Sequence, residues 1–112
     1  MSPASDRTAK PSTSFAGRSG VAYSFNKIED MWLHPRTAGN YLYVRQEADT
    51  RTILCVGTCD DLMAEAKDRW LEAVSRHGAT HLYVRRIVSS RVRQEELADM
   101  LKANDPVMNV VK

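Results

Sequence analysis

The stretch that most constrains the fold is YLYVRQEADTRTILCVG, from Tyr41 to Gly57. Two runs that favour β-structure flank the polar segment QEADTR, a pattern typical of a β-hairpin. The second run, Ile53 to Val56, is continuously apolar, as expected for a strand buried on both faces of a sheet. Other elements must therefore cover both faces of this hairpin.

Two helices are predicted after the hairpin. The segment DDLMAEAKDRWLEAVSRHG begins with Asp60 or Asp61 as its cap and ends at the C′ glycine Gly78. Residues at helical spacing form one stripe that we expect to be buried: Leu62, Ala66, Trp70, Ala73 and Val74.

The second predicted helix is SSRVRQEELADMLKAND, with Ser89 or Ser90 as its cap and Pro106 as its end. Its apolar face contains Leu97, Met100 and Leu101. A strand, ATHLYVRRIV, separates the two helices, and the glycine turn in FAGRSGVAYSF leads into a short strand. The main elements run β-β-α-β-α. This order predicts a small α+β domain with a mostly antiparallel sheet, a hairpin plus a further strand, flanked by helices.

Length and composition fit one globular domain. The 112 residues suffice for a single core, and residues 1–14, rich in Ser, Thr, Pro and Ala, are predicted to be a disordered tail before a domain at 15–112. The formal net charge of +2 does not by itself indicate nucleic acid. No apolar run is long enough to span a membrane and no secretory signal is recognisable, so we expect a cytoplasmic protein without a membrane partner.

Cys55, Cys59, His77 and His81 imitate the spacing of a zinc site. On the predicted single helix, however, His77 lies at the far end from Cys59, and Gly78 separates the two histidines. Zinc needs all its ligands around one point, so we expect no metal and no cofactor here.

AGNYLYV followed by ILCVGTCDDL resembles the paired motifs of the GIY-YIG nuclease family, in which a glycine-x-tyrosine strand faces a tyrosine-x-glycine strand. The segments FAGRSGVAYSF, RHGATHLYV and ADMLKANDPVMN resemble a small bacterial branch of that family. The resemblance extends from Phe15 to Asn109. It implies a GIY-YIG-like fold, in which Tyr41, Gly57 and Asn109 match family positions.

Three positions depart from the family pattern. Cys55 stands where the resemblance implies the second tyrosine, Glu65 where it implies the arginine that meets the phosphate, and Leu97 where it implies the glutamate that holds the metal. Leu97 cannot ligate a metal, and Glu65 reverses the charge needed beside a phosphate. We therefore expect no catalytic residues. Glu96, next to Leu97, is the alternative ligand if the chain is an active magnesium-dependent nuclease.

A stretch without acidic residues contains Arg85, Arg86, Arg91 and Arg93. These arginines are the candidate nucleic-acid-binding residues, for DNA or RNA, unless they are solvated or pair with the acidic helix. Trp32, Tyr41 and Tyr43 offer stacking surface or, more commonly for aromatic residues, belong to the core. The leading hypothesis is a non-catalytic nucleic-acid-binding or accessory module. The alternative is a protein-interaction or dimerisation module.

Overall fold

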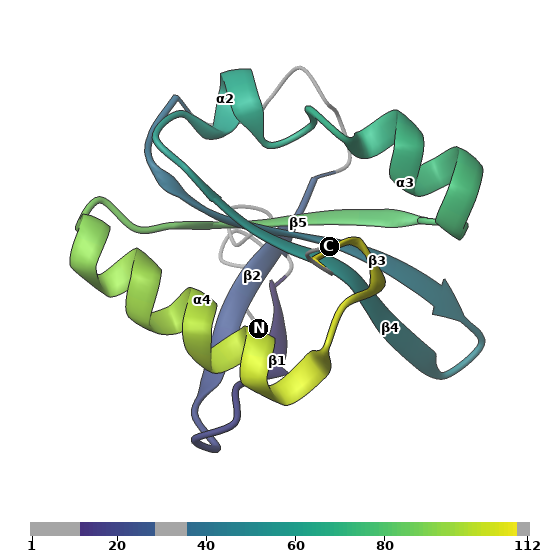
Figure 1. Cartoon of the computed structure of the whole chain (residues 1–112), viewed down its shortest axis with the longest axis horizontal. Coiled ribbons are helices and arrows are strands. Elements are labelled where there is room, and N and C mark those ends of the chain that lie inside the picture. Colours follow the sequence, from purple (N-terminus) through teal and green to yellow (C-terminus); the bar gives the residue numbers. More distant parts are fainter. Residues whose placement is uncertain (1–11, 29–35, 110–112) are drawn as a thin grey trace, which may run out of the picture.

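The computed structural model describes residues 12–28 and 36–109, which form a five-stranded antiparallel sheet with helices on both faces (Figure 1). The order of strands is β1-β2-β5-β3-β4. The predicted α+β class is confirmed. No helix in the described ranges is long and apolar enough to cross a membrane. In chain order the elements are β1 (Ser12–Ala16), β2 (Ala22–Lys27), β3 (Gly39–Glu47), β4 (Thr50–Cys59), α2 (Leu62–Glu65), α3 (Trp70–His77), β5 (His81–Arg86), α4 (Ser90–Asn104) and the 3-10 turn η2 (Val107–Asn109).

The predicted hairpin is formed by β3 and β4 and is confirmed. Its turn is shorter than the segment QEADTR, because Gln46 pairs with Arg51 and only Ala48 and Asp49 lie between the strands. A bulge leaves Leu54 without a partner in β3. Bulges place successive side chains on the same side of a sheet, which explains the unbroken apolar run. Leu54 and neighbouring Cys55 pack on one face, and Val56 packs on the other.

The start of the chain differs from the prediction. Ser12 begins strand β1, so residues 12–14 belong to the sheet and not to the tail, while residues 1–11 lie outside the described part. The expected single strand is thus a hairpin, β1 with β2, in which Phe15 pairs with Tyr23. Phe15 is buried in the core, and this burial stabilises a strand that is otherwise polar.

The predicted helix after the hairpin is wrong in one respect, because it breaks into α2 and α3. The hydroxyl of Tyr43 lies in the break: it donates to the Ala66 carbonyl (2.8 Å) and accepts from the Arg69 N–H (3.1 Å). A side chain inserted into the backbone ladder is a recognised cause of helix breaks. The change of direction leaves Val74, expected in the buried stripe, 42% exposed.

The predicted helix ends are confirmed at two positions. Gly78 closes α3 with a left-handed φ of 73° and donates its N–H to the carbonyls of Ala73 and Val74. Ser89 caps α4 by accepting the Val92 N–H. The apolar face of α4 packs as expected, with Met100 buried and Leu97 and Leu101 packed against the same core cluster.

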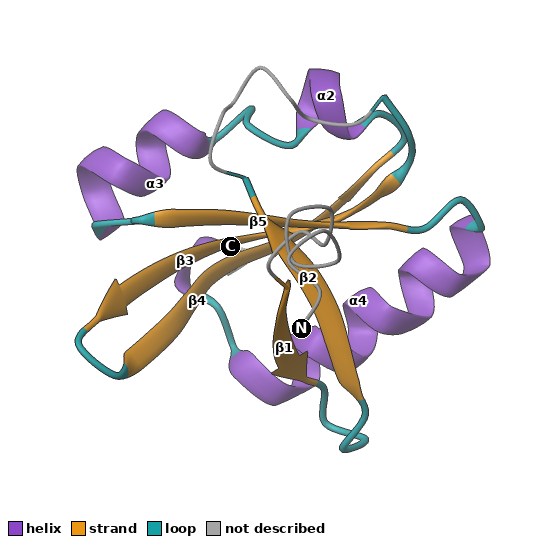
Figure 2. Ribbon diagram, turned by 180° about the vertical axis from the view of Figure 1, so that it is seen from behind, coloured by secondary structure: helices purple, strands orange, loops and turns teal. Residues whose placement is uncertain are grey.

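The sheet separates two cores. Helix α4 covers one face, and α2 with α3 covers the other (Figures 1 and 2). The α4 face includes Phe25, Leu42 and Met100, whereas the α3 face includes Tyr43, Cys55 and Ala73. Because side chains alternate along a strand, neighbouring residues of β3 belong to different cores.

Candidate functional site

Tyr41 and Gly57 form the centre of the candidate site on the α2–α3 face. The two residues are cross-strand partners in β3 and β4. A Cβ atom at Gly57 would collide with the Cζ and hydroxyl of Tyr41, so the ring lies over the glycine. Burial raises the pKa of Tyr41 to about 12, and the nearby Cys55 thiol adds to the effect. Tyr41 is therefore a neutral phenol at physiological pH.

Cys55 and Cys59 lie on the same face of β4, and both are buried free thiols. Burial raises the pKa of each thiol to about 11. Only the thiolate is a strong nucleophile and metal ligand, so both cysteines are inert at neutral pH. Cys55 pairs with Tyr43 across the hairpin and fills core space.

Glu65 has a structural role at the start of α2. Its Oε2 accepts the N–H of Asp61 (3.1 Å), while Asp61 Oδ1 accepts the N–H of Met63 (3.0 Å). This reciprocal arrangement resembles a capping box with the glutamate one residue further along, and it satisfies free N–H groups at the helix start. The carboxylate at the position implied for a phosphate-binding arginine is thus bound to the backbone.

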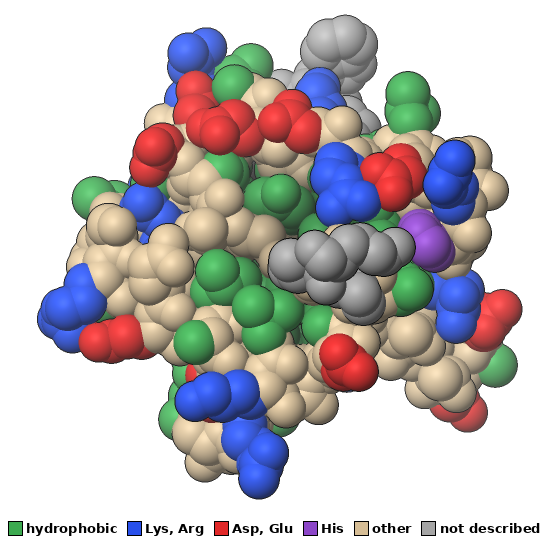
Figure 3. Space-filling view, in the orientation of Figure 1, with side chains coloured by type: hydrophobic (Ala, Val, Ile, Leu, Met, Phe, Trp, Pro, Cys, Tyr) green, Lys and Arg blue, Asp and Glu red, His purple; other side chains and the backbone are tan. Residues whose placement is uncertain are grey.

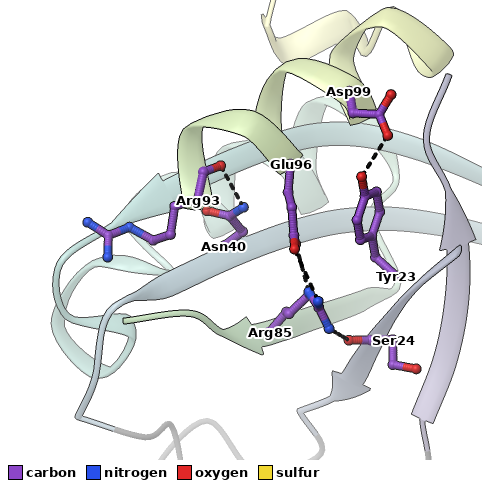
Figure 4. A network of polar contacts seen from close by, with 7 residues as sticks. All are labelled: Tyr23, Ser24, Asn40, Arg85, Arg93, Glu96 and Asp99. Atoms are coloured by element: carbon purple, nitrogen blue, oxygen red, sulfur yellow. Dashed lines mark hydrogen bonds and ion pairs between the residues drawn. The ribbon is translucent and has the colours of Figure 1, made fainter. Parts of the chain in front are cut away.

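Leu97 and Glu96 lie on α4, across the sheet from Tyr41. Leu97 packs against the core of the α4 face. The carboxylate of Glu96 accepts two hydrogen bonds from Arg85, at 2.8 and 3.2 Å (Figure 4). Neither residue shares a site with Tyr41. Glu96 could act as a metal ligand only on the opposite face and after releasing Arg85.

Asn109 closes the free edge of β4. Its Oδ1 accepts the Val56 N–H and its Nδ2 donates to the Val56 carbonyl, both at 2.8 Å. The amide thus forms the two hydrogen bonds that a neighbouring strand would form. Edge strands expose unpaired backbone groups, and this contact satisfies one such pair.

The four candidate arginines do not form one surface. Arg85 is held by Glu96, and Arg91 forms an exposed ion pair with Glu95. Arg93 is buried and donates to the carbonyls of Ile87 and Val88 and to Asp60, which joins α4 to the end of β5 and to the acidic helix region. Arg86 is exposed at the end of β5.

Sequence reasoning missed Arg69. The break between α2 and α3 places it at the start of α3, where it donates to Glu72 and to the Met108 carbonyl. Its positive charge opposes the rise in the pKa of both Tyr41 and Cys55, which locates it beside the candidate site. The residue spacing of the predicted continuous helix did not place Arg69 near the site, because only the break between α2 and α3 turns its side chain in this direction.

The residues of the zinc-like pattern are not gathered together. Cys55 and Cys59 lie in β4, His77 ends α3, and His81 stacks on Tyr83 on the α4 face. Across residues 12–28 and 36–109, no group of three or more His, Cys, Asp or Glu side chains is placed to hold a metal ion. Of the aromatic residues considered for stacking, Tyr43 belongs to the core, and Trp32 lies outside the described residues.

No protein-family model, curated protein or solved structure matches this chain. The GIY-YIG resemblance therefore stays a prediction that depends on the motif residues themselves. The strongest of these are the paired Tyr41 and Gly57, together with Asn109 at the edge of the same hairpin.

Proposed function

We propose that this chain is a GIY-YIG-like domain without a working nuclease centre, acting as a non-catalytic nucleic-acid-binding or accessory module. The observation that carries the proposal is the Tyr41 ring packed over Gly57 on paired strands, at the two positions where the motifs match. We expect the module to act in the cytoplasm, with DNA or RNA as its partner.

The residues at the three departing positions cannot supply the charge that catalysis needs. Phosphodiester cleavage needs a metal ion or cation to stabilise developing negative charge. Leu97 is packed in a core, Glu65 caps a helix, and the Cys55 thiol keeps its proton. The working groups that the resemblance implies are thus replaced by residues that serve the fold.

The connection between β5 and α4, with the first turn of α4, is the surface that we expect to bind nucleic acid. Arg86 and Arg91 are both exposed there. The Arg91–Glu95 pair is exposed, and such pairs contribute only ~0–1 kcal/mol, so phosphate can displace Glu95. Acidic side chains gather over α2 (Figure 3) and would repel a polyanion. We therefore expect a polyanion to approach the first turn of α4 instead.

The test is fluorescence anisotropy with labelled duplex and branched DNA in Mg²⁺ across a salt series, followed by a denaturing gel. We expect salt-dependent binding and intact DNA. The variant Arg86→Gln/Arg91→Gln should lower the salt slope by about 0.9 per lost phosphate contact. The matched control Arg18→Gln/Arg76→Gln removes two exposed arginines from other elements and should leave the slope unchanged. Absence of binding at low salt contradicts the proposal.

A protein-interaction or dimerisation module is the second candidate, because α3 exposes two apolar side chains. Leu71 is 81% exposed and Val74 is 42% exposed. Light scattering after size exclusion would detect a dimer, and Leu71→Glu should then abolish it. An active nuclease is the third candidate: it predicts cut DNA on the same gel and loss of cleavage in Glu96→Ala.

A further inference from the structure

A polar groove opens on the α4 face of the sheet, away from the connection between β5 and α4. It encloses about 350 Å³. Small-molecule sites have volumes of ~300–1,000 Å³, so the groove is large enough for a small ligand. Every strand contributes to its lining, which consists of Thr13 from β1, Lys27 from β2, His81 and Tyr83 from β5, Gln46 from β3 and Arg51 from β4.

Curling of the sheet forms this groove. Strands β1 and β4 are the two edges of the sheet, yet the Arg51 guanidinium lies 4.6 Å from the centre of the Phe15 ring. A cation over an aromatic face is attracted by the ring quadrupole, so this contact holds the two edges near each other. The residues between them line a concave surface.

The lining is rich in hydrogen-bond donors and positive charge. Lys27 and Arg51 are cationic, and the hydroxyls of Thr13 and Tyr83 and the amide of Gln46 can donate hydrogen bonds. Of the described residues that line the groove, none is acidic.

The floor of the groove is fixed by packing. Tyr83 is buried and its ring packs against Phe15, with ring centres 5.0 Å apart. His81 stacks on Tyr83, and its Nδ1 lies 2.7 Å from the Thr80 hydroxyl. The same hydroxyl accepts the N–H of Gln46. A binding site is more effective when its groups are held in place before the ligand arrives.

We propose that this groove binds the phosphate group of an anionic ligand. A phosphate offers several acceptor oxygens and negative charge, which match the donors and cations of the lining, and a planar guanidinium such as that of Arg51 recognises it well. The proposal does not depend on the proposed function. His81 and Arg86 stand at opposite ends of β5, so the groove and the exposed arginines are separate surfaces.

The test uses the full chain, ¹⁵N-labelled and followed by NMR, with inorganic pyrophosphate and, separately, a single-stranded oligonucleotide. We expect pyrophosphate to shift the amide signals of the groove strands. Lys27→Gln/Arg51→Gln should weaken its binding about tenfold or more, since hydrogen bonds to charged groups are strong. The control Arg86→Gln/Arg91→Gln, with the same loss of charge, should change it less than about twofold.

Because Arg51 also contacts Phe15, a second variant, Gln46→Glu, is needed. It places a carboxylate in the groove on an exposed side chain and should likewise weaken pyrophosphate binding about tenfold or more. Groove shifts with pyrophosphate alone support a small phosphorylated ligand and contradict nucleic-acid binding in the groove, whereas groove shifts with the oligonucleotide support a phosphodiester ligand. If neither ligand binds, the groove proposal is overturned. If only Arg86→Gln/Arg91→Gln weakens binding, the groove proposal is also overturned, but the proposed function survives.

Discussion

Gly57 illustrates at the scale of one residue how the absence of a side chain shapes the hairpin. The Tyr41 ring occupies the space that a Cβ at this position would need. The glycine is required by close approach of a neighbour and not by an unusual φ, because its φ is not positive. The packing of the Tyr41 ring therefore requires a glycine at position 57 whether or not the hairpin binds a ligand.

Gly57→Ala should lower the free energy of unfolding by about 1–3 kcal/mol, the usual cost of overpacking. The cost should shrink in a Tyr41→Ala background, where the ring is gone. Urea unfolding of the two single variants and the double variant measures this coupling, expected at about 0.5–3 kcal/mol. Additive effects of the two substitutions would show that the ring and the glycine do not interact.

At the scale of the element, the break between α2 and α3 depends on a residue of the sheet. Tyr43 is fully buried, and its hydroxyl satisfies two backbone groups that a continuous helix would pair internally. A buried backbone group without a partner costs as much as a lost hydrogen bond, so the hydroxyl stabilises the bend. The bend in turn brings Arg69 beside Tyr41 and Cys55.

Tyr43→Phe should reduce stability by about 1–3 kcal/mol, because it leaves both backbone groups unsatisfied. Tyr41→Phe is the matched control, since the Tyr41 hydroxyl makes no hydrogen bond to any described residue. Thermal unfolding of the two variants compares them directly. Equal losses would mean that the Tyr43 hydroxyl does not hold the bend.

At the scale of the whole molecule, Asp99 connects the first hairpin to the last helix. Its carboxylate accepts the Ser19 N–H, the Ser19 hydroxyl and the Tyr23 hydroxyl, at 2.8, 2.7 and 2.6 Å (Figure 4 shows the Tyr23 contact). The hydrogen bonds from Ser19 and Tyr23 lower the pKa of Asp99. They link residues 80 and 76 positions apart along the chain.

This contact predicts a pH dependence of stability. A lowered pKa in the folded state adds stability above the unfolded value of about 4, and this stability is lost as the pH falls through the folded value. Asp99→Asn should therefore be less stable than the native chain at neutral pH and show a smaller loss on acidification. Urea unfolding between neutral and acidic pH tests this, and parallel pH profiles would contradict it.

Some of the candidate site could be predicted and some could not. The positions of Tyr41 and Gly57 followed from their motifs, because the hairpin that aligns them is encoded locally. The motifs did not predict that Leu97 lies across the sheet from Tyr41. Adjacent residues of a strand face opposite cores, and only the packing of α4 decides which core this helix covers. The ion-pair partners of Arg85 and Arg93 could not be predicted either, because they also depend on how α4 packs.

The sequence by itself determined the hairpin, the α+β class and the helix ends at Gly78 and Ser89, since each depends on residues close together in the chain. The tertiary structure decided the insertion of β5 between β2 and β3, the bend before α3 and the groove of basic side chains. Those features depend on contacts between side chains that are far apart in the chain, and local sequence patterns do not predict such contacts.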